Sequence, residues 1–179
     1  MKLTLPGVSI LLSLLIIPVA AESRMAMFDK QYAKVQSELA NAYAELSGYN
    51  GEMAKIPGLF ASLHYARSSI VEVSESIGAV DTFEPDEAEI IGNMTVGIVP
   101  AATDFLNLAS MKVKLIPTEQ IPSQSVRSKV TEWAKDCIRD DKALFTKILG
   151  KCQSVDRNAL DSAILDITNA YTAAQKALD

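Results

Sequence analysis

The chain has 179 residues, of which 49% are hydrophobic and 22% charged, and its formal net charge is −5. A mildly acidic chain without basic clusters argues against nucleic-acid binding and against electrostatic docking on anionic membranes. The chain contains one His, so a metal site built from several imidazoles is excluded within a single copy.

The first 21 residues have the pattern of a secretory signal peptide. Lys2 supplies a positive charge, residues 11–17 form a short apolar run, and the small residues Val19-Ala20-Ala21 precede the cleavage point. The apolar run is too short for a membrane-spanning helix, which needs about 20 apolar residues. We therefore expect residues 1–21 to be removed and residues 22–179 to form one secreted domain without a transmembrane segment. An uncleaved membrane anchor is the alternative interpretation.

Through most of the remaining chain, apolar residues recur every three or four positions, which is the pattern of amphipathic helices. The first predicted helix carries Phe28 on its apolar stripe and ends at Gly48, where Tyr49-Asn50-Gly51 indicates a turn. The second runs from near Pro57 to Gly78, because proline suits a first helical turn and glycine suits a C-terminal cap.

The third predicted helix begins near Pro85 and reaches about Lys112. Asp86 and Glu87 lie in its first turn, where the helix dipole favours anions. Pro100 falls inside this helix and is expected to kink it, because proline removes one backbone donor and clashes with the preceding turn.

Pro117 and Pro122 bound an extended connector, and two further helices are predicted over residues 126–149 and 160–178. None of the segments shows the sustained alternation of a strand. Because the connectors are short, neighbouring helices are expected to pack antiparallel. The sequence therefore predicts an all-α, single-domain antiparallel bundle of about five helices, with the third helix kinked at Pro100.

In an exported protein, the first expectation for Cys137 and Cys152 is a disulfide. If residues 126–149 form one helix, however, Cys137 and Gly150 are about 20 Å apart along its axis. A disulfide requires a Cα separation of roughly 4.4–6.8 Å. We therefore expect an unbroken helix with no bridge within the chain. A break near Arg139 would permit a bridge, and without such a break the thiols are either free or bridged between chains.

Motifs for common enzymatic chemistry are missing from the sequence. It has no nucleophile elbow, zinc-binding His-Glu pair, phosphate-cradling glycine loop or calcium loop. The acidic residues fall mostly on the solvent sides of the predicted helices and do not indicate a glycosidase pair. We therefore expect a protein that is not an enzyme and that uses no cofactor and no metal.

A few polar residues lie on or beside the apolar stripes, and these are His64, Arg67, Ser74, Asp104, Asp141 and Thr168. One interpretation is that each forms local hydrogen bonds or reaches solvent. A second interpretation is that some of them hold the polar end of an apolar ligand, since small-molecule sites are usually apolar with a few placed polar groups. His64 and Arg67 are suited to pair with a carboxylate, and Ser74 is suited to donate a hydrogen bond to it.

Asn93-Met94-Thr95 is the only N-glycosylation sequon of the chain. Met94 falls on the inner stripe of the third predicted helix, so its neighbour Asn93 is expected to face water. We therefore predict that Asn93 is glycosylated in a eukaryotic host, and an unmodified surface asparagine is the alternative.

The order of these parts resembles a known family. The resemblance rests on short segments between and within the helices, namely residues 47–51, 76–80, 82–88, 98–101 and 108–115. With the leader and the two Ala-rich C-terminal helices, they are similar to the fungal hydrophobic surface binding protein A family, also called the cell-wall galactomannoproteins. The resemblance covers roughly residues 28–178.

The resemblance implies a secreted or wall-associated helical bundle that binds hydrophobic surfaces. For some members it also implies capture of fatty acids between the helices, and a role in recruiting hydrolases to water-insoluble polymers. This chain departs from many members because it carries Cys137 and Cys152 and lacks a long Ser/Thr-rich tail with an anchor signal. The wall-attachment interpretation is weakened accordingly, and the matched motifs carry over no ligand residue.

Our first hypothesis is a secreted, non-enzymatic binder of fatty acids or similar amphiphiles in a cavity between the helices. An acyl chain gains about 0.8 kcal/mol per buried CH₂, and a kink at Pro100 would hold such a cavity open. The polar end is assigned to His64, Arg67 and Ser74. The predicted apolar lining consists of Phe60, Leu63, Ile70, Met94, Ile98, Phe105, Phe145 and Ile164.

Two further hypotheses are kept. In the first of them the protein adsorbs to hydrophobic surfaces and recruits secreted hydrolases without an internal ligand, which requires a large exposed apolar patch. A helical inhibitor of plant wall enzymes ranks last, because such inhibitors depend on disulfides that this chain cannot supply.

Overall fold

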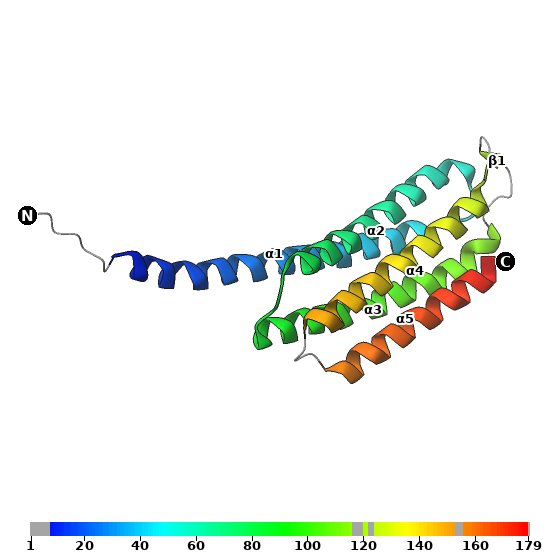
Figure 1. Ribbon diagram of the computed structural model, residues 1–179. Coiled ribbons are helices and arrows are strands. Elements are labelled where there is room, and N and C mark those ends of the chain that lie inside the picture. The colour runs from blue at the N-terminus through cyan, green and yellow to red at the C-terminus, as the bar shows by residue number, and fades with distance from the viewer. Residues whose placement is uncertain (1–7, 116–119, 122–123, 153–155, 179) are drawn as a thin grey trace, which may run out of the picture.

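The computed structural model describes residues 8–115, 120–121, 124–152 and 156–178. Long helices dominate these residues, which confirms the predicted all-α class (Figure 1). The α-helices are α1 (Val8–Ser47), α2 (Ile56–Ala79), α3 (Pro85–Lys112), α4 (Val126–Lys151) and α5 (Arg157–Leu178).

The remaining elements are short and lie between helices. The 3₁₀ turns η1 (Met53–Lys55) and η2 (Val113–Leu115) follow α1 and α3. Strands β1 (Gln120–Ile121) and β2 (Gln124–Ser125) form a small antiparallel ladder before α4, with Gln120 opposite Ser125. Figure 1 shows β1 and the C-terminus at the same end of the bundle.

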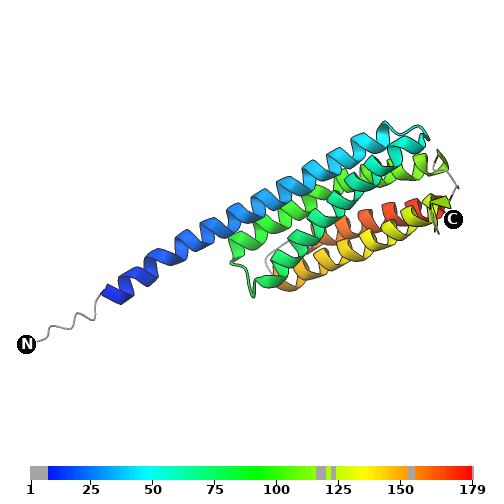
Figure 2. The same cartoon turned by 90° about the horizontal axis from the view of Figure 1, so that it is seen from above.

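Helix α1 is continuous from Val8, and its N-terminal part projects beyond the other four helices (Figure 2). The removal of residues 1–21 stays a prediction. In the part of the chain whose side chains are described, no helix combines the length and apolar character needed to cross a membrane.

The turn after α1 is built from backbone groups that the helix leaves unpaired. Gly51 has a φ of 94°, a left-handed conformation that glycine adopts without strain. Lys112 Nζ donates to the carbonyls of Ser47 and Tyr49, at 2.9 and 2.8 Å. Lys55 Nζ donates to the carbonyl of Gly48 at 3.1 Å. These bonds fix the end of α1 against the end of α3.

Helix α3 begins at Pro85, as predicted, and continues through Pro100 to Lys112. Glu87 caps the start, because its Oε2 accepts a hydrogen bond from the backbone N–H of Glu84 at 3.1 Å. Pro100 has no N–H, so the Val96 carbonyl lacks its usual intrahelical donor. The kink at Pro100 stays a prediction.

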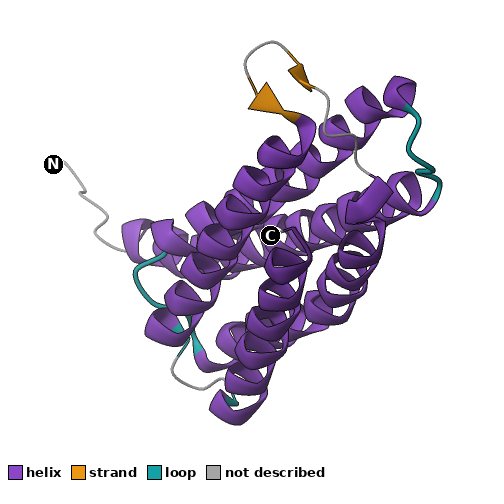
Figure 3. Cartoon of the chain, turned by 90° about the vertical axis from the view of Figure 1, so that its right-hand side faces the viewer, coloured by secondary structure: helices purple, strands orange, loops and turns teal. Residues whose placement is uncertain are grey.

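The contacts between helices close a ring in the order α1, α2, α4, α5, α3, and back to α1. Figure 3 shows the bundle from the side on which the C-terminus lies. Successive helices run in opposite directions, as predicted, but the main contacts of α3 are with α1 and α5, which run parallel to it. Helices α2 and α4 are likewise parallel neighbours. The core fills the ring, and its largest fully buried side chains include Phe28, Ile77, Ile91, Leu106, Leu144, Ile148 and Leu160.

Constant residue separations show the register of the parallel pairs. Between α1 and α3, Arg24 contacts Glu87 and Tyr32 contacts Thr95, each pair 63 residues apart. Between α2 and α4, the contacts of Arg67 with Asp140, of Lys147 with the Ser74 carbonyl and of Lys151 with the Gly78 carbonyl each span 73 residues. The parallel neighbours therefore keep one register over several turns.

Helix α4 is unbroken, as expected, and this excludes a Cys137–Cys152 bridge within the chain. Cys137 is 14 residues before Lys151 on the same helix, which places the two about 21 Å apart along the axis. Cys152 follows directly and is buried as a free thiol. Burial raises the pKa of the Cys152 thiol to about 11.

Candidate functional site

Asp141 is a carboxyl group in a position that belongs to the core. It is 4% exposed and shares the buried face of α4 with Leu144 and Ile148. The hydroxyl of Tyr171 on α5, also buried, donates a hydrogen bond to Asp141 Oδ2. Burial raises the pKa of the Asp141 carboxyl to about 7, although the Tyr171 hydrogen bond opposes the rise and Asp140 adds to it. Asp141 is therefore protonated in a substantial fraction of molecules near neutral pH.

The adjacent Asp140 points to α2 and forms part of an ion-pair network. Arg67 Nε lies 2.6 Å from Asp140 Oδ2, and Arg67 NH1 lies 3.4 Å from Asp136. Arg139 contacts the same two carboxylates, at 2.9 Å from Asp136 and 3.1 Å from Asp140. These carboxylates hold Arg67 at the α2–α4 boundary.

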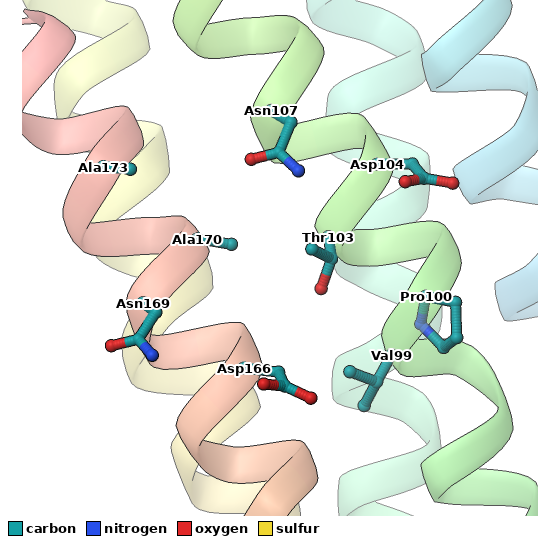
Figure 4. Close-up of a pocket in the computed structure, with 9 residues that line it drawn as sticks. All are labelled: Val99, Pro100, Thr103, Asp104, Asn107, Asp166, Asn169, Ala170 and Ala173. Carbon is teal, nitrogen blue, oxygen red and sulfur yellow. The ribbon is translucent and has the colours of Figure 1, made fainter.

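A groove of about 560 Å³ runs between α3 and α5 at the level of Ala170 (Figure 4). Val99 and Ala170 are buried and form part of its wall. Thr103 Oγ1 is buried and has no hydrogen-bond partner among the described residues. In Figure 4 Thr103 lies on the side of α3 that faces α5. The full lining is Val99, Pro100, Thr103, Asp104, Asn107, Asp166, Asn169, Ala170 and Ala173.

A smaller pocket of about 230 Å³ lies between α1 and α3, lined by Leu39, Ala40, Tyr43, Ala101 and Asp104. Asp104 lines both pockets, so the two lie at one level of the bundle. We use the name mid-bundle belt for this level, which comprises Leu39, Arg67, Asp104, Asp140, Asp141, Ala170 and Tyr171. The mid-bundle belt includes side chains from every helix of the ring.

Buried polar groups elsewhere in the ring mostly have partners. The hydroxyl of Tyr32 contacts Thr95 Oγ1 at 2.5 Å, and burial raises the pKa of Tyr32. Ser62 and Ser69 donate to carbonyls of their own helix, at 2.9 and 2.7 Å. Tyr49 OH is buried without a partner among the described residues, and burial raises its pKa.

The part of the interior that the structure describes contains no cationic side chain. Of the residues that the structure describes, the buried polar or charged ones are Ser62, Ser69, Ser74, Glu87, Thr95 and Asp141. No Lys, Arg or His is among them. Glu87 lies at the start of α3 and contacts Arg24. Asp141 is thus the titratable group that the described interior presents at mid-bundle.

The structure brings most of the predicted lipid-binding residues into the ring. Ser74 on α2 is also buried. Phe60, Met94 and Ile164 are partly buried against the core. The predicted residues that are fully part of the core are Leu63, Ile70, Ile98, Phe105 and Phe145. That these residues bind lipid stays a prediction, because they also fill an ordinary core.

The two basic residues of the predicted site are not inside the ring. His64 is exposed and packs beside Tyr65, with ring centroids 5.9 Å apart. Arg67 is only partly buried and is engaged by Asp136 and Asp140. Both lie beside the buried face of α2 that Leu63 and Ile70 define, and their pairing with a lipid carboxylate stays a prediction.

Several residues of the mid-bundle belt and groove were not singled out by sequence reasoning as polar groups of a site. Tyr171 falls on the apolar stripe of the last helix, and Asn107, Asp166 and Asn169 are exposed polar residues of ordinary helix surfaces. Asp104 and Asp141 were singled out, because both are spaced with apolar neighbours. The described residues contain no group of three or more His, Cys, Asp or Glu side chains that could hold a metal ion.

Asn93 is exposed on α3, as predicted, whereas Thr95 of the same sequon is fully buried. The acceptor side chain thus faces water in the folded protein. Its glycosylation stays a prediction.

Comparisons with known proteins identify the fold. No protein-family model matches the chain, and no curated protein matches its sequence. Among solved structures, AfMP4p in complex with palmitic acid matches with a TM-score of 0.74 and 14% identity, over 86% of this chain and 99% of that one. Ligand-binding domain 1 of the Penicillium marneffei MP1 protein, complexed with arachidonic acids, matches with a TM-score of 0.71 and 11% identity, over 87% and 99%.

The chain therefore has an all-helical fold that is shared with proteins solved with a fatty acid bound. At these identities the likeness shows the fold alone. The resemblance to the hydrophobic surface binding protein A family stays a prediction.

Proposed function

We propose that the protein is a non-enzymatic binder of fatty acids or similar amphiphilic lipids, which it holds between the helices of the ring. The observation that carries the proposal is the shared fold with two proteins whose structures contain palmitic or arachidonic acid. We further propose that the protein is secreted after loss of residues 1–21 and is glycosylated at Asn93.

The ring geometry supports this proposal. Packed helices lie about 8–10 Å apart, so each axis in a ring of five is about 8 Å from the centre, against about 6 Å in a ring of four. Protein interiors are close-packed, so this wider centre must be filled by large side chains or by a ligand. Small side chains are buried on four of the helices, and the buried alanines are Ala42, Ala66, Ala88, Ala102, Ala163, Ala170 and Ala174.

The burial of an acyl chain supplies enough free energy for binding, so the proposed function requires no catalytic step. An acyl chain gains about 0.8 kcal/mol for each CH₂ that moves from water into the apolar interior. Ile98 and Phe105 on α3 are 4% and 3% exposed and belong to the core that an acyl chain would contact. Replacement of either residue by tryptophan would fill the space that the proposal assigns to the lipid.

Native mass spectrometry of the secreted protein, followed by organic extraction, tests the proposal. We expect close to one lipid per chain in the wild type, and its loss in folded Ile98→Trp and Phe105→Trp variants. The matched control is Leu165→Trp, because Leu165 is 59% exposed, and this variant should keep the lipid. A wild-type protein that is isolated without lipid and does not bind added palmitate contradicts the proposal.

The alternative function, adsorption to hydrophobic surfaces with recruitment of secreted hydrolases, is favoured by one end of the bundle. Met53, Met111 and Leu115 are 43%, 76% and 43% exposed. A Cβ on Gly51 would lie 3.4 Å from the Leu115 carbonyl oxygen, so η1 and η2 are close together. If this end adsorbs, Met111→Lys should weaken binding to a hydrophobic sensor surface, while Ile98→Trp should leave it unchanged.

A further inference from the structure

The polar end of a lipid held inside the ring would meet an acid instead of a base. The described interior has no buried Lys, Arg or His, and Arg67 is engaged by Asp136 and Asp140 at the α2–α4 boundary. A carboxylate anion without a cation or several donors is costly to bury. Asp141 is the buried titratable group at mid-bundle, so its chemistry decides which polar end can be accommodated.

Asp141 and Tyr171 form a hydrogen-bonded pair between α4 and α5 on the inner faces of both helices. Tyr171 donates to Asp141 Oδ2, and both side chains are buried. When Asp141 is protonated, its hydroxyl can donate a hydrogen bond, and when it is ionised it can only accept. The hydrogen-bonding capacity of this carboxyl group therefore changes with its protonation state.

Tyr171 follows directly after a residue that lines the groove between α3 and α5. This residue is Ala170, and Ala173 lines the groove as well (Figure 4). In the same groove, Thr103 Oγ1 is buried and has no partner among the described residues. A polar group passing between α3 and α5 here would meet the Thr103 hydroxyl before the Asp141–Tyr171 pair.

The charge around this level is mostly negative. The charged groups at or next to the level of Asp141 are Glu38 on α1, Arg67 on α2, Asp104 on α3, Asp136, Arg139, Asp140 and Lys142 on α4, and Asp166 on α5. The two arginines are paired with Asp136 and Asp140. Asp104 and Asp166 at the rim of the groove add to the unfavourable potential for an anion.

We propose, on the basis of the lipid-binding function above, that Asp141 and Tyr171 bind the polar end of the lipid at mid-bundle and select one that brings a proton. The favoured ligands are lipids that end in a hydroxyl or a carboxylic acid. A fatty acid and Asp141 share at least one proton, because two ionised carboxylates in contact repel each other. An alcohol satisfies Asp141 in both states, since its oxygen accepts from the acid and its hydroxyl donates to the carboxylate.

Laurate and 1-dodecanol, which have equal chain lengths, test this selection by displacement of the uncharged fluorescent probe N-phenyl-1-naphthylamine. For the full mature protein, we expect laurate affinity to fall at least tenfold from pH 5.5 to pH 8.5, and dodecanol affinity to change less than threefold. In Asp141→Asn, the amide donates without titrating. This variant should therefore bind laurate at least tenfold more tightly than wild type at pH 8.5 and within threefold at pH 5.5.

The matched control is Asp161→Asn, which removes an exposed carboxylate of α5 outside the mid-bundle belt and should keep the wild-type loss of laurate affinity with pH. Laurate binding that is equal at both pH values in wild type, or equally pH-dependent in Asp141→Asn, overturns the assignment while lipid binding itself stands. If neither laurate nor dodecanol binds at either pH, the proposed function fails and the assignment fails with it.

Discussion

The hydroxyl of Tyr32 on α1 donates a hydrogen bond to Thr95 Oγ1 on α3, at 2.5 Å, inside the ring of helices. The direction follows from Thr95, which donates its own proton to the Ile91 carbonyl at 2.8 Å. Both side chains are buried. The pair spans 63 residues, as does the Arg24–Glu87 pair about two turns away, so two polar contacts set the register of parallel α1 and α3.

Removing one member of the Tyr32–Thr95 pair should lower the free energy of unfolding. The loss should be larger for the variant that leaves a buried hydrogen-bond donor unpaired. Thr95→Val leaves the Tyr32 hydroxyl without an acceptor, and we expect a loss of about 1–3 kcal/mol in the free energy of unfolding. Tyr32→Phe should cost about 1 kcal/mol, because Thr95 keeps its bond to Ile91. Urea denaturation of both single variants and the double variant measures the coupling. The exposed Thr172, whose hydroxyl also donates within its own helix, gives the control Thr172→Val. Strictly additive losses would show that the two side chains are not coupled.

The Arg24–Glu87 pair should stabilise the start of α3 above acidic pH. The hydrogen bond from Arg24 lowers the pKa of the Glu87 carboxyl, although burial opposes it. A carboxyl group whose pKa is lowered on folding stabilises the folded protein at pH values above its unfolded-state pKa of about 4.3. This stabilisation is lost as the pH falls through the folded-state pKa. We expect Glu87→Gln to lower the free energy of unfolding by about 1 kcal/mol at pH 7 and by much less at pH 3. The expected loss at pH 7 is small because Arg24 is partly exposed to solvent. Glu72→Gln, which breaks the exposed pair with Lys34, should cost under about 0.5 kcal/mol.

Asp141 should make the folded protein less stable as the pH rises. Its pKa is raised to about 7 in the folded state, so the folded protein binds more protons than the unfolded chain between about pH 4 and pH 7. This contribution of Asp141 to the free energy of unfolding is fully present below the pKa of the group in the unfolded chain. It is lost as the pH rises through the pKa of the group in the folded protein. Asp141→Asn should therefore match wild type near pH 4 and exceed it at pH 8.5, by up to about 4 kcal/mol. Thermal denaturation of both proteins from pH 4 to pH 9 checks this, and parallel pH profiles would contradict it.

Pro100→Ala should stabilise the free protein. The substitution restores an N–H that can donate to the Val96 carbonyl, and Pro100 is exposed, so little packing is lost. Proline inside a helix costs about 3 kcal/mol relative to alanine, and the greater freedom of alanine in the unfolded chain offsets about 1 kcal/mol. We expect a net gain of about 1–2 kcal/mol by urea denaturation. Pro57→Ala is the control, because Pro57 lies in the first turn of α2, where no intrahelical donor is missing. A loss of stability in Pro100→Ala would indicate that the helix depends on the proline.

The sequence predicted the helices because their ends carry local signals. Pro85 with the acidic residues after it marks the start of α3, and Gly48 marks the end of α1. The ring order could not be predicted, because an apolar stripe shows which face is buried and not which helix covers it. The parallel contacts of α3 with α1 and α5 are therefore a result of tertiary packing alone.

The sequence predicted only part of the candidate site, because an apolar stripe does not show which neighbouring helix covers it. Asp141 is spaced with Leu144, so its place on an inner face was visible in the sequence. Its pairing with Tyr171 depends on the register between α4 and α5, which no local pattern contains. His64 follows Leu63 by one residue, a rotation of about 100° that leaves it at the edge of the stripe. The neighbouring helices do not cover that edge, and His64 is exposed.

A crystal structure with 16-bromohexadecanoic acid, with the bromine located by anomalous scattering, tests most directly whether the lipid lies between the helices. We predict one bromine peak inside the ring, enclosed by side chains from at least three helices. A peak on the outer surface, such as beside the exposed Met111, or the absence of any bound molecule at saturating concentration, would contradict lipid binding inside the ring.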